Sequence, residues 1–347
     1  MITPALRRVA AIGVAIGLAL SLAACSTTTS SGTADTKTAA SDAESGAFPV
    51  TIKSALGSAT IPSAPKRVVT IGWGSADTLV SLGIVPVGIE KVTYGNDSHG
   101  DYPWVTAAIQ KMGKKLPATF DVYPDIDMTA LAQLNPDLII APQSGITAAQ
   151  YKTLSALAPT VAYPGAAWQT TWDDQISVIG KAVGQPTKAK SLISGITTKL
   201  AAVKKSNPDF SKYTFAYASM GNPGTLSVYL KGDPRVALLS AMGLRESSEL
   251  VGIKPPAGSY IGTIGLEKSN LLDSSDLLFT WYYDQANEKQ VTAQPLIASI
   301  PAIKRDSVVS STDEQFVMGS TFITPLSVPW VIDRYVPMIK KAITKVG

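Results

Sequence analysis

The sequence predicts an α/β fold, and three observations support this prediction. β-branched runs alternate with helical segments in both halves of the chain. The two halves follow a similar order, and between them residues 186–206 form one long amphipathic segment. Alternating strands and helices form mostly parallel sheets that are covered on both faces. We therefore expect two Rossmann-like lobes with mostly parallel sheets, joined by a single long connecting helix.

The first half begins with a strand at Arg67–Ile71, which Gly72-Trp73-Gly74 ends. Ser75 is a suitable N-cap for a helix through Leu82. The strands and helices that complete this half are expected at 86–89 (strand), 128–134 (helix), 137–141 (strand), 148–158 (helix) and 160–162 (strand).

The centre of the chain is helical. A helix at 171–183 ends at Gly184, and Pro186 suits the first turn of the next one. This second helix would reach Ser206, a length of about 30 Å at 1.5 Å per residue. In the second half we expect strands at 214–219, 225–230 and 276–280 and helices at 235–242 and 266–272.

The N-terminus predicts export. Arg7 and Arg8 precede an uncharged apolar run, Val9–Ala24, which ends at Cys25. This arrangement is typical of a secretory signal, and the run is shorter than the roughly 20 apolar residues of a membrane span. It resembles the lipobox of bacterial lipoproteins, which implies that Cys25 is acylated; the alternative is a buried free cysteine. Residues 26–46 are small and polar, so we expect them to form a disordered tether.

Composition excludes several classes of function. Without the signal arginines, 28 basic residues stand against 26 acidic ones, which gives no reason to expect nucleic-acid binding. His99 is the only histidine and Cys25 the only cysteine, whereas zinc sites and most nucleophilic triads need more of these residues. Gly72-Trp73-Gly74 with Glu90 imitates a dinucleotide fingerprint, but Asp77 replaces its third glycine.

Aromatic residues gather where the predicted strands end. Ligands of α/β sheets bind beyond the carboxyl ends of the strands, so we expect an aromatic cleft between the lobes. Such a cleft suits a bulky, partly apolar ligand with anionic oxygens. For each residue alone, packing in the core or rim is the alternative. The expected ligand-binding residues are Trp73, Tyr94, Tyr102, Trp104, Gln143, Trp168, Arg235, Trp281 and Tyr282.

Several stretches make the chain similar to the substrate-binding proteins of iron-siderophore ABC transporters. They are Pro65–Val69, Leu79–Gly88, Leu131–Ile140, Ala158–Val161 and Gly265–Phe279. The resemblance implies a monomer without catalytic activity or resident cofactor, anchored by lipid to the extracytoplasmic face of the bacterial membrane. It would capture a ferric siderophore and deliver it to a membrane permease and its ATPase. The chelator would supply all the metal ligands.

The resemblance also implies one acidic permease-docking residue in each lobe. Glu267 matches the position in the second lobe, whereas Thr129 stands at the position in the first, so Asp127 is the substitute. The alternatives are a cobalamin or haem carrier of the same fold, a tethered hydrolase and a structural surface protein. The scarcity of arginine favours a hydroxamate or mixed chelator. The predicted parts are a signal peptide (1–24), a lipidated cysteine with linker (25–47), a first lobe (48–168), connecting helices (169–210) and a second lobe (211–347).

Overall fold

The computed structural model describes residues 43–222 and 224–347, which fall within one compact unit, Thr38–Gly347. The predicted signal peptide, Cys25 and most of the predicted linker lie outside the described residues. Within the described part of the chain, no helix is both long and apolar enough to cross a membrane.

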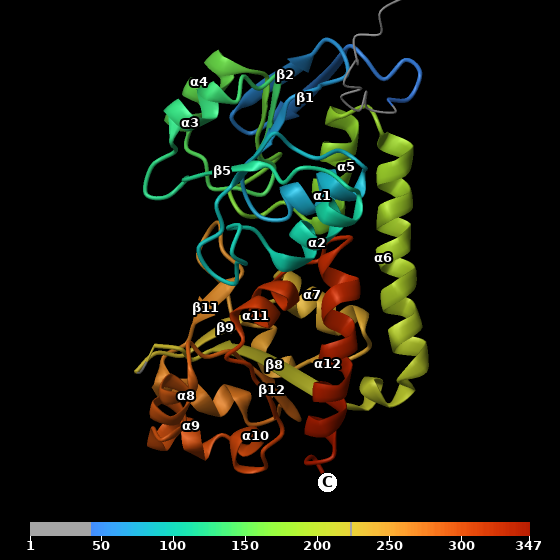
Figure 1. Cartoon of the computed structure of the whole chain (residues 1–347). Coiled ribbons are helices and arrows are strands. Elements are labelled where there is room, and N and C mark those ends of the chain that lie inside the picture. Colours follow the sequence, from blue (N-terminus) through green and yellow to red (C-terminus); the bar gives the residue numbers. More distant parts are fainter. Residues whose placement is uncertain (1–42, 223) are drawn as a thin grey trace, which may run out of the picture. The chain divides into compact units, whose positions relative to one another are not determined.

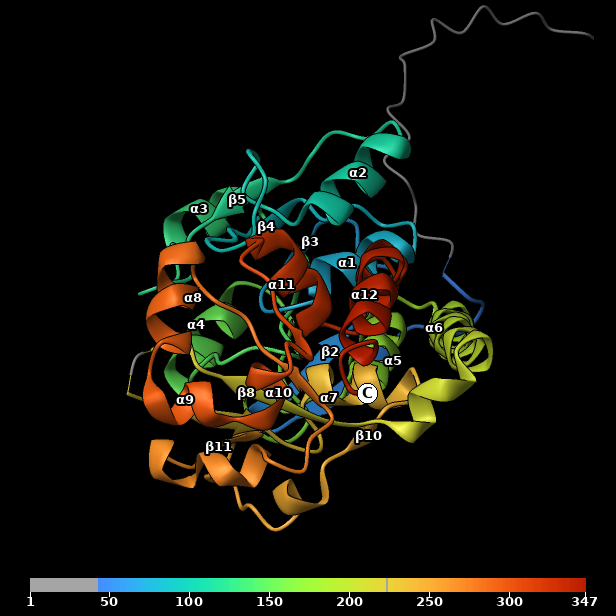
Figure 2. The same ribbon diagram turned by 90° about the horizontal axis from the view of Figure 1, so that it is seen from below.

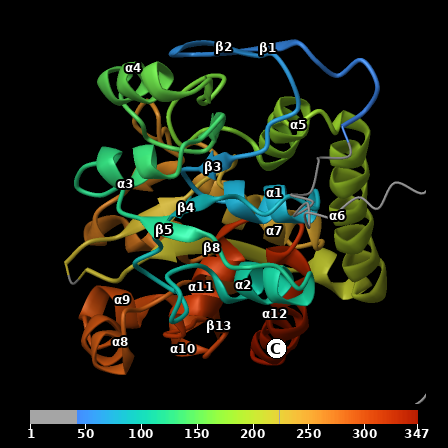
Figure 3. The same cartoon turned by 45° about the horizontal axis from the view of Figure 1, so that its top comes forward.

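The first lobe contains a five-stranded sheet in the order β5-β4-β3-β6-β7, and all its strands run parallel. A separate antiparallel hairpin, β1–β2, packs against α5 and β7 (Figure 3). The elements of this lobe are β1 (Val50–Ser54), β2 (Gly57–Ile61), β3 (Val68–Thr70), α1 (Ser75–Ser81), β4 (Gly88–Glu90), α2 (Pro103–Lys111), β5 (Ala118–Phe120), α3 (Met128–Gln133), β6 (Leu138–Ile140), α4 (Ala148–Leu157), β7 (Thr160–Val161) and α5 (Trp172–Ala182).

The second lobe is built on a mixed sheet in the order β11-β9-β8-β12-β13, with β10 also paired to β8. β8, β10, β12 and β13 run parallel, whereas β9 and β11 are antiparallel to their neighbours. The elements are η1 (Pro208–Lys212), β8 (Thr214–Ser219), β9 (Ser227–Tyr229), α7 (Pro234–Ala241), β10 (Arg245–Glu246), η2 (Ser248–Leu250), β11 (Ile261–Thr263), η3 (Leu266–Leu272), β12 (Leu277–Phe279), α8 (Gln285–Thr292), α9 (Pro295–Ser299), α10 (Pro301–Lys304), β13 (Val308–Val309), α11 (Glu314–Thr321) and α12 (Ser327–Ile343).

The connecting helix α6 spans Pro186–Ser206, the same limits that the sequence predicts. It contacts α5 of the first lobe and α7 of the second (Figure 1). Glu44, at the end of the predicted linker, caps its start: the carboxylate accepts hydrogen bonds from Thr187 N at 2.7 Å and from Thr187 Oγ1 at 2.9 Å. The chain therefore enters the body at the N-terminus of the helix that joins the lobes.

A second connection between the lobes is the packing of α11 and the start of α12 on the first lobe. α11 and α12 lie side by side (Figure 2), and Met318 and Phe322 share one buried cluster with Tyr102 and Trp104. The predicted fold class is confirmed: two α/β lobes are joined by one long helix, with β9 and β11 as the antiparallel exceptions. The sequence did not predict the β1–β2 hairpin, α2 or the helices after β12.

Candidate functional site

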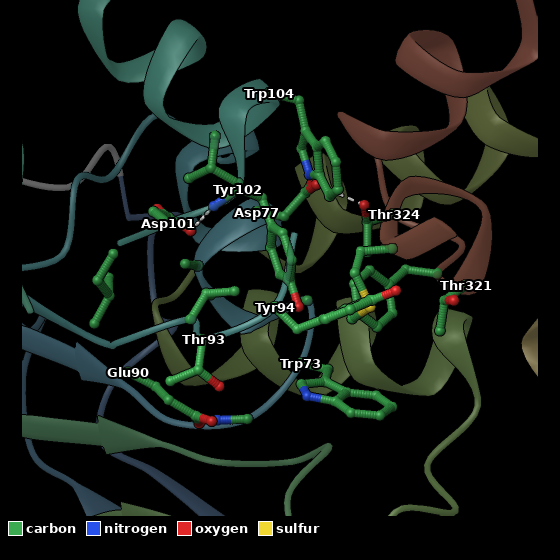
Figure 4. A pocket seen from close by; sticks show the side chains of 18 of the residues that line it. Trp73, Asp77, Glu90, Thr93, Tyr94, Asp101, Tyr102, Trp104, Thr321 and Thr324 are labelled. Carbon is green, nitrogen blue, oxygen red and sulfur yellow. Dashed lines mark hydrogen bonds between the residues drawn. The ribbon is translucent and has the colours of Figure 1, made fainter. Parts of the chain in front are cut away.

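Two adjoining cavities lie between the lobes. The first cavity, of about 320 Å³, is shown in Figure 4, and the second has a volume of about 470 Å³. The residues that line both are Trp73, Gly74, Arg235, Thr321, Phe322 and Thr324. A ligand at this junction would therefore contact both lobes.

A tight turn after β3 presents Trp73 to both cavities. The flanking glycines adopt left-handed backbone conformations, with φ of 84° at Gly72 and 73° at Gly74, which glycine adopts without steric cost. Glu90 holds the turn because its Oε2 accepts a hydrogen bond from Gly72 N at 2.6 Å. Burial raises the pKa of this carboxyl above its usual range, and the bond from Gly72 opposes the rise. Gly72-Trp73-Gly74, the motif that imitates a dinucleotide fingerprint, is thus a tight turn. It leaves the Trp73 side chain 39% exposed.

Trp168 extends this aromatic wall into the second cavity. Its φ is 61°, a conformation that few residues other than glycine adopt. Two bonds hold it: Trp168 N donates to Ser144 O at 3.1 Å, and Gln143 Nε2 donates to Trp168 O at 3.0 Å. The indole lies against Gly145, where a Cβ would occupy the same space. The centres of the Trp168 and Trp73 rings are 5.0 Å apart.

Aromatic side chains also form the deep wall of the first cavity. Tyr102 and Trp104 stack with ring centres 4.8 Å apart and planes 3° apart. Both are buried. Opposite the first-lobe residue Tyr94 lies Trp281, at 6.4 Å between ring centres.

Arg235 places one cation at the junction of the cavities. Its Nη1 lies 2.9 Å from Asp233 Oδ2, and its guanidinium stacks over the Tyr229 ring at 4.2 Å. Trp281 Nε1 donates to Tyr229 Oη at 3.3 Å. Tyr229 thereby supports Arg235 and Trp281, two of the three second-lobe residues that the sequence placed in the cleft.

Two buried acids in the first cavity were not predicted as site residues. Asp77, on α1, accepts hydrogen bonds from Thr324 Oγ1 at 2.5 Å and from Leu326 N at 3.1 Å, and so links the first lobe to the α11–α12 connection. Asp101 Oδ1 accepts one from Tyr102 N at 2.7 Å. Burial raises the pKa of each acid to about 7, despite the hydrogen bonds that oppose it. The only sequence signal was Asp77 in place of a fingerprint glycine.

The cavities bring together eight of the nine expected ligand-binding residues. The exception is Tyr282, which is 1% exposed and packs in the core of the second lobe. Side chains alternate along an extended segment, so Trp281 faces the cavity while Tyr282 faces the sheet interior. The eight residues in the lining are Trp73, Tyr94, Tyr102, Trp104, Gln143, Trp168, Arg235 and Trp281.

The other expected site residues lie elsewhere. Glu267 and Asp127 are exposed, and Asp127 caps α3 by accepting a bond from Ala130 N at 2.9 Å. His99 Nε2 lies 2.9 Å from Pro117 O, outside the lining of both cavities. Among the described residues, no group of three or more His, Cys, Asp or Glu is arranged to hold a metal ion.

Comparisons with known proteins match most of the chain. The family model for periplasmic binding proteins matches residues 68–314. The probable siderophore-binding lipoprotein YfiY of Bacillus subtilis is 26% identical over 73% of this chain and 77% of the relative. FecB of Escherichia coli, an Fe(3+) dicitrate-binding periplasmic protein, is 23% identical over 76% of this chain and 82% of its own length. The structure of Streptococcus pneumoniae PiaA in complex with ferrichrome has a TM-score of 0.78 at 29% identity, and the match covers 85% of this chain and 99% of PiaA.

Proposed function

This chain belongs to the periplasmic binding protein family, and we propose that it is the substrate-binding protein of an ABC importer, which captures a ferric siderophore and delivers it to the membrane permease. The observation that carries the proposal is the pair of aromatic cavities with Arg235 at their junction. A ferric chelate is bulky, has apolar arms and presents anionic oxygens around the metal. The aromatic faces fit the arms, and the guanidinium fits the oxygens.

The relatives support the ligand class by their own names, which specify a siderophore, ferric dicitrate and ferrichrome. Because the chelator surrounds the iron, the protein needs to supply no metal ligand. Residues of both lobes line each cavity, and we propose that a monomer binds the chelate without catalysis.

The haem alternative is weaker because haem needs an axial ligand such as His, Tyr, Cys or Met. Of the candidate side chains, His99 has its Nε2 2.9 Å from Pro117 O, and Tyr94 in the first cavity has a buried Oη. For the hydrolase alternative, His99 would have to act as the general base, and it does not line either cavity.

A fluorescence titration of the full-length protein tests the proposal. Trp73 and Trp168 are 39% and 41% exposed, so a ferric chelate bound against them should quench tryptophan emission. We expect saturation at one ferric hydroxamate per chain, with weaker binding of the iron-free form. Binding of cobalamin or haem, with no response to ferric chelates of the hydroxamate, catecholate and carboxylate types, would overturn the proposal.

Docking on the permease is a separate step, for which we propose Glu267 and Asp127. Asp127→Asn removes the charge and keeps an oxygen that can cap α3, whereas Asp127→Ala also costs about 1 kcal/mol of stability. We expect Glu267→Gln and Asp127→Asn to reduce uptake by cells while leaving chelate affinity unchanged. The exposed acids Asp125 and Asp273 provide matched controls, as Asn variants. Normal uptake by the double variant Asp127→Asn, Glu267→Gln would exclude this docking role.

We also propose that Cys25 carries the lipid that holds the protein at the extracytoplasmic face of the membrane. Cys25→Ser should move the protein from the membrane fraction to the soluble extracytoplasmic fraction, with chelate binding unchanged. Retention of this variant in the membrane fraction would contradict lipid anchoring.

A further inference from the structure

We propose that the first cavity binds a protonated amine, and hence that the preferred ligand is a ferric chelate with a cationic arm. This inference rests on the proposed function and specifies its substrate class. The metal-binding part of the ligand would lie at the junction beside Arg235 and in the second cavity. Its amine-bearing arm would enter the first cavity.

The first reason is an unsatisfied acceptor deep in the first cavity. Asp101 is 3% exposed and lines the cavity. Its Oδ1 accepts the bond from Tyr102 N, but its Oδ2 has no hydrogen-bond partner among the described residues. A buried carboxylate oxygen without a partner is costly, and an ammonium group supplies both a donor and the opposite charge.

The balance of charges in the lining is the second reason. Three acids line the first cavity, namely Asp77, Glu90 and Asp101, together with the cations Lys91 and Arg235. Both cations already contact acids outside this lining: Lys91 Nζ is 3.8 Å from Asp121, and Arg235 is paired with Asp233. The acids that remain in the cavity therefore outnumber the cations available to them.

The third reason is the aromatic wall. The stacked pair Tyr102 and Trp104, together with Tyr94, surrounds the cavity that Asp101 lines (Figure 4). The face of an aromatic ring attracts a cation, most strongly where water is excluded. Tyr94 Oη also lacks a hydrogen-bond partner within the described part of the chain, so it is a second free acceptor in the lining of this cavity.

Two ligands that differ in one charge test the proposal. Ferrioxamine B is a linear trihydroxamate chelate with one terminal primary amine, and N-acetylation removes the charge of that amine. We expect the wild-type protein to bind ferrioxamine B at least about tenfold more tightly than its N-acetyl derivative. This ratio of affinities is the one expected for the loss of one charge-assisted hydrogen bond. Asp101→Asn keeps an acceptor for Tyr102 N and removes the charge, so it should bring the ratio close to one. Asp125→Asn, an exposed charge change outside both cavities, should leave the ratio unchanged.

The outcomes separate this inference from the proposed function. Equal affinity of the wild-type protein for the two chelates would overturn the amine site and leave siderophore binding intact. An undiminished ratio in Asp101→Asn would also overturn it. If these two chelates, ferrichrome and ferric chelates of the catecholate and carboxylate types all fail to bind, the proposed function itself fails. Thermal unfolding of Asp101→Asn establishes that the variant is folded before its affinities are compared.

Discussion

The two lobes have related sheets but contribute to the cavities in different ways. In the first lobe the lining follows the strands directly: Trp73 comes after β3, Tyr94 after β4 and Gln143 after β6. In the second lobe only Trp281 lies within a few residues of the end of a parallel strand of the sheet, which is β12. The rest of its contribution comes from α7, from residues 258–261 ahead of and within β11, and from residues 317–324 of α11 and the segment after it.

Strand direction explains the difference. When all strands are parallel, their carboxyl ends meet at one edge and their loops converge on a ligand. β9 is antiparallel to β8, so its carboxyl end does not lie beside those of β8 and β12, and the chain after it reaches the cavities only from Asp233 onward, at the start of α7. In the second lobe, Tyr229 at the end of β9 positions the two lining residues Arg235 and Trp281. Its ring stacks on the guanidinium, and its Oη accepts a hydrogen bond from the indole. We infer that the first lobe supplies the aromatic surface and the second supplies the cation.

The largest effect that tests this division is expected from Arg235→Met. The substitution leaves Asp233, whose side chain is 6% exposed, without its cation. Breaking a buried ion pair by removing one partner costs about 3 kcal/mol or more of unfolding free energy, and ferric chelate affinity should fall as well. Urea unfolding and fluorescence titration measure the two effects.

A second substitution separates stability from binding. Asp233→Asn in the Arg235→Met background removes the unpaired charge and keeps a cap for α7, where Asp233 Oδ1 accepts from Arg235 N at 2.9 Å. We expect the double variant to regain most of the stability and none of the affinity. If affinity also returned, Arg235 would be a structural residue and the division between the lobes would be wrong.

Asp77 joins the two lobes, and its ionisation should make the stability depend on pH. Its pKa is raised from the usual value near 4 to about 7, as is that of Asp101. Between about pH 4 and pH 7 the folded protein therefore holds more protons on these two carboxyls than the unfolded chain does. The unfolding free energy should fall as pH rises through this window, by up to about 1.4 kcal/mol per pH unit for each group. Urea unfolding at pH 5 and pH 7 measures the slope.

Asp77→Asn should remove the part of this slope that Asp77 contributes, and the exposed change Asp125→Asn is the charge-matched control. The side-chain hydrogen bond from Ser274, with other local bonds, lowers the pKa of Glu249 to about 2. Glu249 therefore affects the unfolding free energy only at a pH below this window. A wild-type stability that does not change from pH 5 to pH 7 would show that folding does not raise the pKa values of Asp77 and Asp101.

Trp73→Ala tests the aromatic role of the first lobe. Trp73 lines both cavities and contacts Trp168 and Phe322. Loss of such a central aromatic residue costs about 2 kcal/mol, so the Kd for a ferric hydroxamate should rise about 30-fold. Trp281→Ala is the matched change in the second lobe, and because Trp281 lines only the first cavity its effect should be smaller. A larger effect at Trp281 would reverse the comparison.

The sequence predicted those features of the fold that local chemistry determines. α6 has the predicted limits because Pro186 occupies its first turn and Asn207-Pro208 ends it. The part of the site that follows parallel strands was also predictable, since the topology alone places strand ends together. Residues 317–324 were not found because they reach the site through the packing of α11 on Tyr102 and Trp104, a contact between distant parts of the chain.

Tyr282 and Asp101 show two further limits of the sequence. Tyr282 was chosen as one of three consecutive aromatic residues, and alternation along the extended segment after β12 would have separated it from Trp281. Asp101 looks like an ordinary loop acid because nothing local indicates that it is buried. Its environment depends on how α2 packs against α1 and α11.

Gly145→Ala is expected to have the smallest effect and tests how precisely the first lobe positions its wall. A Cβ at residue 145 would overlap the Trp168 indole, so the indole must move. The left-handed backbone conformation of Trp168 limits the positions that its side chain can take. We expect a cost of about 1 kcal/mol, measured as a roughly fivefold rise in the Kd for a ferric hydroxamate. Gly165→Ala is the matched control, because a Cβ there meets nothing within 4 Å. Equal affinities for the two variants would mean that the ligand does not require Trp168 in its observed position, and the aromatic contribution of the first lobe would then rest on Trp73 and on the Tyr102–Trp104 pair.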